Sequence, residues 1–375
     1  MKKIVISIFI TALAAGCSSK QELTSAVEME KPRAKVDPKT VPYEELLNWK
    51  NSYKTSKQDD SPSIAVEVAS RAKSMSNAEL LKEANSLLRQ GERRKAKAYY
   101  HELVRLDPSN TQVLLELASL YLEENQVEES FSTLMEIKNL LNDEIRNDGS
   151  FVYKYRYTLA VAHLKRGENN KGHQYLSKLI AEDPSFAPAY ATLAGNYVKL
   201  DKLSTAEFVA KRGLEKAGDD AALYNLLGVI ERTRGTLETA ETWFNKALEK
   251  DPNHIPSLVN RASVNIIRFE YETASKDVGK ALSLNPFDVS ALMMGSVILH
   301  KQDQLEAAKN ILVKAVDIEP ENAGARFNLA LIEEKLERQT SARQLLEEVL
   351  QLEKKGSGLY EKAKLKLVEL APLTQ

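Results

Sequence analysis

The chain has 375 residues, of which 43% are hydrophobic, so it is long and apolar enough to form a folded body. Its 52 basic and 53 acidic side chains nearly cancel, which gives no electrostatic support for nucleic-acid binding, a function that favours a basic domain or stripe. The single cysteine, Cys17, excludes stabilisation by a disulfide within the chain.

The first sixteen residues have the pattern of a signal peptide. Lys2 and Lys3 provide a positive start, residues 4–15 form a short apolar core, and small residues follow. A core of this length is too short to cross a hydrocarbon layer of roughly 30 Å as a helix. Residues 1–16 are therefore predicted to be a signal peptide.

The stretch LAAGC at residues 13–17 resembles the lipobox of bacterial lipoproteins, although Ala14 stands where that family prefers Leu. The resemblance implies cleavage before Cys17 and acylation of its thiol and amino group, which gives stable anchoring when two or more chains are attached. Ser18 replaces the Asp that many bacteria use for retention in the inner membrane, which favours the outer membrane facing the periplasm. The alternative is an ordinary signal peptide with an incidental cysteine.

Residues 17–63 are predicted to be a lipidated, flexible tether, because they are rich in Ser, Lys, Thr and Pro and show no sustained period. Within them, residues 42–53 place Tyr43, Leu46, Leu47 and Trp49 at helical spacing. We interpret this segment as a marginal local helix, with a docking motif as the alternative.

Apolar residues recur at i, i+3, i+4 and i+7 from about residue 64 onward, which is typical of amphipathic helices. We expect an introductory helix over 64–76. Prolines follow acidic or amide residues at 184, 252, 286 and 320, at spacings of 34 or twice 34. Proline lacks the N–H that a helix interior needs, so each one is expected to separate two repeating units.

Two columns of small residues recur with the same spacing of 34, which predicts close crossings of paired helices. The first column comprises Ala160, Ala194, Gly228, Ala262, Ser296 and Ala330. The second comprises Gly172, Ala206, Ala240, Ala274, Ala308 and Ala342. A column of mostly larger side chains lies four residues after the second: Leu176, Ala210, Phe244, Val278, Leu312 and Leu346. Gly167 and Gly235 are expected in turns between paired helices.

This 34-residue pattern resembles the tetratricopeptide repeat, whose units are helix pairs. The resemblance implies an all-α fold, a right-handed α-solenoid of about eight helix pairs over 77–356. Eight extra residues near 142–149 are expected to lengthen one loop between repeats. Residues 357–375 are predicted to form a polar-faced capping helix that closes the last apolar surface.

Catalytic patterns are missing from the sequence. None of the five histidines lies four residues from another, and neither GxSxG nor a P-loop pattern occurs. We expect no enzyme activity, no cofactor and no metal.

The first helix of each repeat lines a concave ligand groove in the tetratricopeptide family, and the resemblance therefore implies groove residues. We expect them to be accessible to a ligand, with packing between repeats as the alternative. The candidates are Tyr157, Asn225, Asn260, Met293, Phe327 and Asn328. Amide side chains suit an extended peptide backbone. Leu81 stands where the family's carboxylate clamp would need Lys or Arg, which disfavours that mode.

The leading hypothesis is a non-enzymatic scaffold or adaptor in the bacterial envelope that binds other envelope proteins through an extended segment. It would help to assemble or regulate a multi-protein machine of the outer-membrane assembly, pilus or gliding type. The bilayer is the second expected partner, through Cys17. The alternatives are a module that acts on cell-wall enzymes or glycan, and a cryptic hydrolase.

Overall fold

The structure is a computed structural model that describes residues 61–370 apart from 90–91 and 142–148. Within this part there are 18 α-helices and no strand, so the all-α prediction is confirmed. The predictions for the signal peptide, Cys17, the helix at 42–53 and nearly all of the 142–149 insertion lie outside the described residues. So does the predicted tether apart from its last three residues, 61–63.

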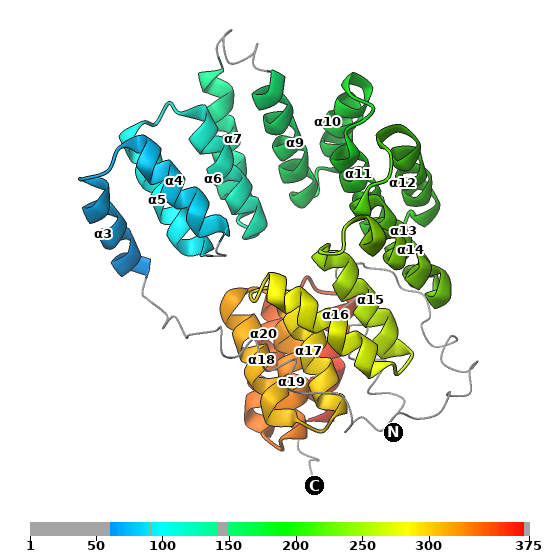
Figure 1. The fold of residues 1–375 in the computed structure, drawn as a ribbon. Helices are drawn as coiled ribbons and strands as arrows, with labels where there is room; N and C mark the ends of the chain where they lie inside the picture. Colours follow the sequence, from blue (N-terminus) through cyan, green and yellow to red (C-terminus); the bar gives the residue numbers. More distant parts are fainter. Residues whose placement is uncertain (1–60, 90–91, 142–148, 371–375) are drawn as a thin grey trace. The chain divides into compact units, whose positions relative to one another are not determined.

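The described helices belong to two compact units, residues 61–193 and 194–370. The first unit runs from blue to green in Figure 1. Its helices are α3 (Ser61–Ala72), α4 (Asn77–Arg89), α5 (Arg93–Leu106), α6 (Thr111–Glu123), α7 (Val127–Leu140), α9 (Gly149–Lys165), α10 (Asn169–Glu182) and the start of α11 (Ala187–Lys199). Each pair α4–α5, α6–α7 and α9–α10 forms a helical hairpin.

The second unit holds the remainder of α11 and the helices that follow it. They are α12 (Leu203–Ala217), α13 (Ala221–Arg234), α14 (Leu237–Lys250), α15 (Ile255–Ile267), α16 (Tyr271–Leu284), α17 (Val289–Lys301), α18 (Leu305–Ile318), α19 (Ala323–Lys335), α20 (Gln339–Leu352) and α21 (Gly358–Glu369). From α4 to α20 the chain forms eight helix pairs, as expected. The predicted right-handed winding depends on the placement of the units and stays a prediction.

Short polar side chains cap four of the eight first helices, α6, α13, α17 and α19. Asn110, Asp220, Asp288 and Asn322 each accept a hydrogen bond from the backbone N–H three residues later, at 2.8–3.1 Å. These bonds satisfy N–H groups that have no partner inside the helix, and each such cap stabilises by about 1 kcal/mol. The residues recur at one position of the repeat, so the sequence pattern itself starts the helices.

From the second helix pair onward, the turn inside each pair contains one residue with positive φ. The series from the second pair onward is Asn125, Gly167, Asp201, Gly235, Phe269, Asp303 and Glu337, with φ between 56° and 86°. The predicted turn positions of Gly167 and Gly235 are confirmed. The left-handed conformation strains side chains other than Gly, Asn and Asp, so Phe269 and Glu337 are the two outliers of the series, and Phe269 is the bulkier one.

The small-residue columns lie where the sequence analysis expects them, because both columns are fully buried or nearly so. Two glycines of these columns lie where a neighbouring side chain leaves no room for a Cβ. A Cβ added to Gly228 would lie 2.4 Å from Cε1 of Phe244, and one added to Gly172 would lie 2.3 Å from Leu164. The largest residue of the third column thus packs against a position that has no side chain at all.

Helices α17 and α19 are buried around their whole circumference. Residues 291–299 of α17 and 327–333 of α19 are continuous buried runs, each longer than one helical turn. Most of their apolar side chains belong to one core cluster that extends from α14 to α21. A helix that is covered on every side has no exposed face, so these two helices carry no open groove surface.

The last helix packs on the stack and leaves two large apolar side chains exposed. In α21, Leu359 and Ala363 are buried, but Leu365 and Val368 are 62% and 67% exposed beside the charged Glu361. Helix α21 therefore closes the core as a cap, and its exposed face carries Glu361, Lys364 and Glu369 together with these two apolar side chains. No helix in the described part of the chain is long and apolar enough to cross a membrane.

Candidate functional site

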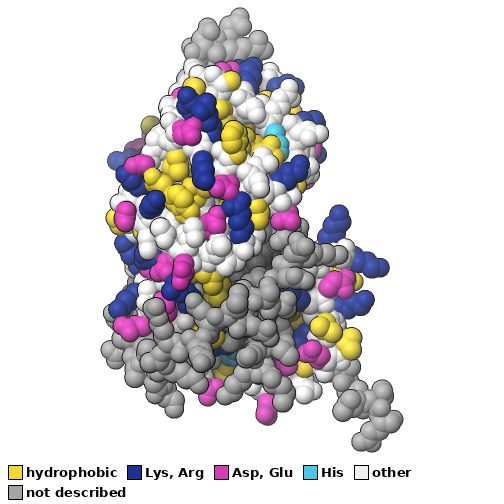
Figure 2. All heavy atoms as spheres, turned by 90° about the vertical axis from the view of Figure 1, so that its right-hand side faces the viewer, with side chains coloured by type: hydrophobic (Ala, Val, Ile, Leu, Met, Phe, Trp, Pro, Cys, Tyr) yellow, Lys and Arg dark blue, Asp and Glu magenta, His cyan; other side chains and the backbone are white. Residues whose placement is uncertain are grey.

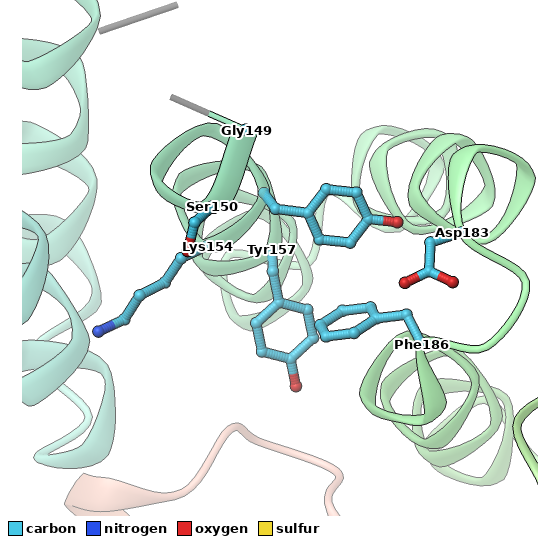
Figure 3. Close-up of a pocket in the computed structure, with 7 residues that line it drawn as sticks. Gly149, Ser150, Lys154, Tyr157, Asp183 and Phe186 are labelled. Atoms are coloured by element: carbon cyan, nitrogen blue, oxygen red, sulfur yellow. The ribbon is translucent and has the colours of Figure 1, made fainter. Parts of the chain in front are cut away.

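A pocket of about 390 Å³ lies beside helix α9 in the first unit, and Tyr157 lines it. The helix contributes one face to the pocket, and the segment between α10 and α11 contributes the opposite wall (Figure 3). Besides Tyr157, the lining residues are Gly149, Ser150, Tyr153, Lys154, Asp183 and Phe186. We call this site the aromatic pocket.

Three rings define the aromatic pocket, and each is half-buried. The centroid of the Phe186 ring lies 5.2 Å from that of Tyr153 and 5.5 Å from that of Tyr157, with interplanar angles of 84° and 87°. The hydroxyl of Tyr153 donates to the carbonyl of Leu179 at 2.6 Å, and that of Tyr157 bonds the hydroxyl of Thr192 at 2.8 Å. Both tyrosine rings are therefore fixed in orientation before any ligand arrives.

Phe186 occupies the repeat position that carries a helix cap in other repeats. It directly precedes α11, as Asn110, Asp220 and Asn322 directly precede α6, α13 and α19. A phenylalanine side chain has no oxygen that can accept a hydrogen bond from the helix N–H groups. Residue 186 therefore gives α11 no side-chain cap, and its ring packs against the rings of Tyr153 and Tyr157 instead.

The charged groups around the aromatic pocket are mostly paired. Lys154 bonds Glu116, and its side chain points away from Asp183 and Phe186 in Figure 3. Arg156 bonds both oxygens of Glu182 at 2.8 and 3.1 Å. Asp183 Oδ1 accepts from the hydroxyl and the N–H of Ser185, which lowers the pKa of that carboxyl. Asp183 therefore stays charged, and no cation within the described part of the chain pairs with it.

The tyrosine nearest these carboxylates responds to them. Burial raises the pKa of Tyr153, and the negative charges of Asp183 and Glu182 raise it further. The phenol therefore stays neutral and donates its hydrogen bond, and the surroundings of its oxygen are negative.

The predicted groove asparagines of the second unit bond each other. Asn225 Oδ1 accepts from Asn260 Nδ2 at 2.9 Å and from the hydroxyl of Ser257 at 3.2 Å. Ser257 in turn bonds His254 Nδ1 at 2.7 Å. This network joins α13 to α15, so the structure favours packing between repeats as the role of Asn225 and Asn260.

The other three predicted groove residues are inaccessible. Met293 is 7% exposed, and Phe327 and Asn328 are 0% exposed. The expectation that these side chains face a ligand is wrong, because α17 and α19 are covered on all sides. Asn328 has no hydrogen-bond partner for either amide atom, and neither does Asn265. An unpaired buried amide is costly, so both residues are sites of local instability.

No cluster of three or more potential metal ligands occurs among residues 61–370 as described. His163 of α9 bonds Glu168 at 3.2 Å, and burial lowers the pKa of its imidazole. On the face drawn in Figure 2, basic and acidic side chains alternate around small apolar areas, and neither sign gathers into a large patch in the part that is described.

Of the residues that line the aromatic pocket, Tyr157 was among the groove residues expected from the sequence, and Tyr153, Asp183 and Phe186 were not. A signal for Phe186 was present in the sequence. From residue 186 onward, Phe186 is the one residue without a polar side-chain atom in a column, 34 residues apart, that continues with Asp220, His254, Asp288 and Asn322. An aromatic residue at a capping position indicates that another role has replaced capping.

Comparison with known proteins places this geometry among tetratricopeptide repeats. Three family profiles described as tetratricopeptide repeats match the chain, at residues 81–136 and 301–357, at 163–230 and at 221–254. Together these segments cover just over half of the chain.

Similar proteins cover the chain to different extents. Protein NPGR2 of Arabidopsis thaliana is 36% identical over 72 residues, which is 19% of this chain and 10% of that protein. The crystal structure of the APC/C hetero-tetramer Cut9–Hcn1 matches with a TM-score of 0.54 at 16% identity, over 88% of this chain and 60% of that one. A tetratricopeptide repeat protein from Parabacteroides merdae matches with a TM-score of 0.46 at 17% identity, over 68% of this chain and 98% of that one. The chain thus spans a tenth of NPGR2 and less than two thirds of the Cut9–Hcn1 chain, and the structural likeness shows the fold.

Proposed function

Because the chain is a tetratricopeptide-repeat protein, we propose that it is a non-enzymatic scaffold that binds an extended segment of another protein in the aromatic pocket. The observation that carries this proposal is the pocket itself. Its rings are oriented by hydrogen bonds to Leu179 and Thr192, and one of them replaces a helix cap. Concave sites with oriented aromatic rings and few polar groups are typical of ligand recognition.

A glycan ligand is the alternative, because aromatic rings also bind sugars. Phe186 stands nearly perpendicular to Tyr153 and Tyr157, at 84° and 87°. This arrangement encloses one side chain instead of presenting a flat platform on which a sugar ring could stack. The geometry therefore favours a peptide.

Crosslinking in the cell that makes the protein tests this function. A photoreactive phenylalanine at position 157 should give discrete crosslinked proteins, which mass spectrometry identifies. The matched control places the same group at Gln174, an exposed residue of α10 that does not line the pocket. Identical crosslinks from both positions, or none from position 157, would contradict the proposal.

We further propose that the scaffold is anchored in the bacterial envelope by an acylated Cys17, in support of a multi-protein machine at the outer membrane. The support is the sequence of residues 1–18, with its lipobox-like stretch at 13–17. Mass spectrometry of the mature N-terminus should show the acyl chains. If Cys17→Ser is processed at the same place and fractionates as the wild type does, the anchor is not Cys17.

A further inference from the structure

The aromatic pocket contains one carboxylate, that of Asp183, which forms no ion pair with any residue that the structure describes. Lys154 and Arg156 are the basic residues nearest to it on α9, and they are paired with Glu116 and Glu182. Among the described residues, the carboxylate of Asp183 accepts hydrogen bonds only from the hydroxyl and the N–H of Ser185, both at Oδ1. Its other oxygen, Oδ2, remains available to a ligand.

The rings add a preference for cations to that carboxylate. The face of an aromatic ring is electron-rich and attracts a cation that lies within about 6 Å of its centre. The tyrosine hydroxyls are turned to Leu179 and Thr192, and the Tyr153 hydroxyl has already donated its one hydrogen. The ligand therefore meets ring surfaces and a negative charge.

Arginine fits these two features better than lysine does. Its guanidinium is planar, stacks on aromatic rings and presents several N–H donors to a carboxylate. Lysine carries a compact, strongly hydrated charge that loses more hydration in such a site. A volume of about 390 Å³ holds a single long side chain but not a folded element.

We propose that the aromatic pocket is the subsite for an arginine side chain of the partner's extended segment, held by Asp183 and by the rings of Tyr153, Tyr157 and Phe186. This inference rests on the proposed function and specifies the chemistry of the partner.

The probes are acetylated pentapeptide amides of the form Gly-Gly-X-Gly-Gly, with X as arginine, citrulline, leucine or glutamate. Citrulline has the shape of arginine without its charge. The full chain is labelled with 3-fluorotyrosine, and Tyr153→Phe and Tyr157→Phe assign the two pocket signals. We expect saturable shifts with the arginine peptide at a Kd roughly three- to tenfold lower than with citrulline.

Two variants separate binding from folding. Asp183→Asn keeps the turn, because Asn285 already accepts the N–H of Phe287 in the equivalent turn at 3.1 Å. It should abolish the preference for arginine over citrulline, whereas the control Asp251→Asn, at a turn that does not line the pocket, should leave the preference intact.

Phe186→Asn restores the missing cap and removes a ring. It should weaken arginine binding while the melting temperature stays the same or rises, so a loss of binding cannot be assigned to misfolding.

Equal affinity for arginine and citrulline in the wild type, tighter binding of leucine or glutamate, or an unchanged preference in Asp183→Asn would overturn the inference. If position 157 still crosslinks a partner in that case, the scaffold function stands without the arginine preference. If the arginine peptide binds as expected but position 157 captures nothing, the scaffold function fails and the pocket chemistry stands.

Discussion

Gly228 and Phe244 are matched in size, so the change in the free energy of unfolding when either one is altered can be worked out from the structure. In Gly228→Ala, the new methyl group would lie 2.4, 2.6 and 2.9 Å from Cε1, Cδ1 and Cζ of Phe244. Phe244 is fully buried and cannot swing away. Overpacking of this kind costs about 1–3 kcal/mol, and the higher helix propensity of alanine returns about 1 kcal/mol. We expect a net loss of about 0–2 kcal/mol in the free energy of unfolding, towards the upper end because three ring atoms lie within 3 Å of the new methyl group.

The second variant, Phe244→Leu, should lose about 1–2 kcal/mol by leaving a small cavity. The double variant should come within about 1 kcal/mol of the wild type, because the two defects compensate. Other repeats already use this combination: Ala160 with Leu176, and Ala330 with Leu346. The chain therefore contains two natural examples of the proposed repacking.

Hydrogen exchange read by mass spectrometry is the suitable assay, because repeats unfold partly independently and one global midpoint can hide a local change. Each single variant should lower protection in α13 and α14 and in the adjoining α15, and the double variant should restore it. If the losses of the two single variants add in the double variant, the two side chains do not share one space and the assigned helix register is wrong.

Three further variants test other features of the chain. Phe269 has φ 64° and is 52% exposed. Phe269→Asn, which introduces the residue type found at Asn125, should raise the free energy of unfolding by about 0.5–1 kcal/mol, seen as a higher midpoint in urea. A lower midpoint would show that the ring contributes more by packing than it costs in strain. Asn328→Leu should stabilise by about 1 kcal/mol in the same assay, because it removes an unpaired buried amide. Destabilisation would indicate that the amide has a partner in solution. Burial, reinforced by Lys301 and Lys335, lowers the pKa of His300 to about 4 from an ordinary 6.5. The unfolded chain then binds the proton more readily, so stability should fall by about 2 kcal/mol between pH 8 and pH 5, and His300→Gln should remove this part of the loss.

The fold was predictable because the contacts that define it are local and periodic. Ala240 and Ala274 are fully buried where the spacing of 34 places them, since each crossing involves two helices joined by a short turn. The positive φ at Gly167 and Gly235 follows from the same spacing. The mixed outer face of α21 was not predictable, because no following repeat constrains Leu365 and Val368.

The site was only partly predictable, because exposure depends on neighbours that the repeat period does not specify. Tyr157 and Phe327 occupy equivalent positions of their repeats, yet the first lines a pocket and the second is enclosed in the core. Asn225 and Asn260 have the amides that a peptide would need, but they bond each other across two helices. Such differences come from the size and spacing of the adjoining repeats.

The residue before each first helix has a wider consequence. At this position a repeat can hold a small polar side chain that secures its own helix, as Asp220 does, or a large one that faces outward, as Phe186 does. It cannot hold both. Selection for tighter ligand binding at this position would therefore produce helices whose first turn lacks a cap and frays. In any repeat array of this kind, slow hydrogen exchange of the first backbone amides of a helix would indicate a capped, structural repeat. Fast exchange there would indicate a repeat whose preceding residue binds a ligand.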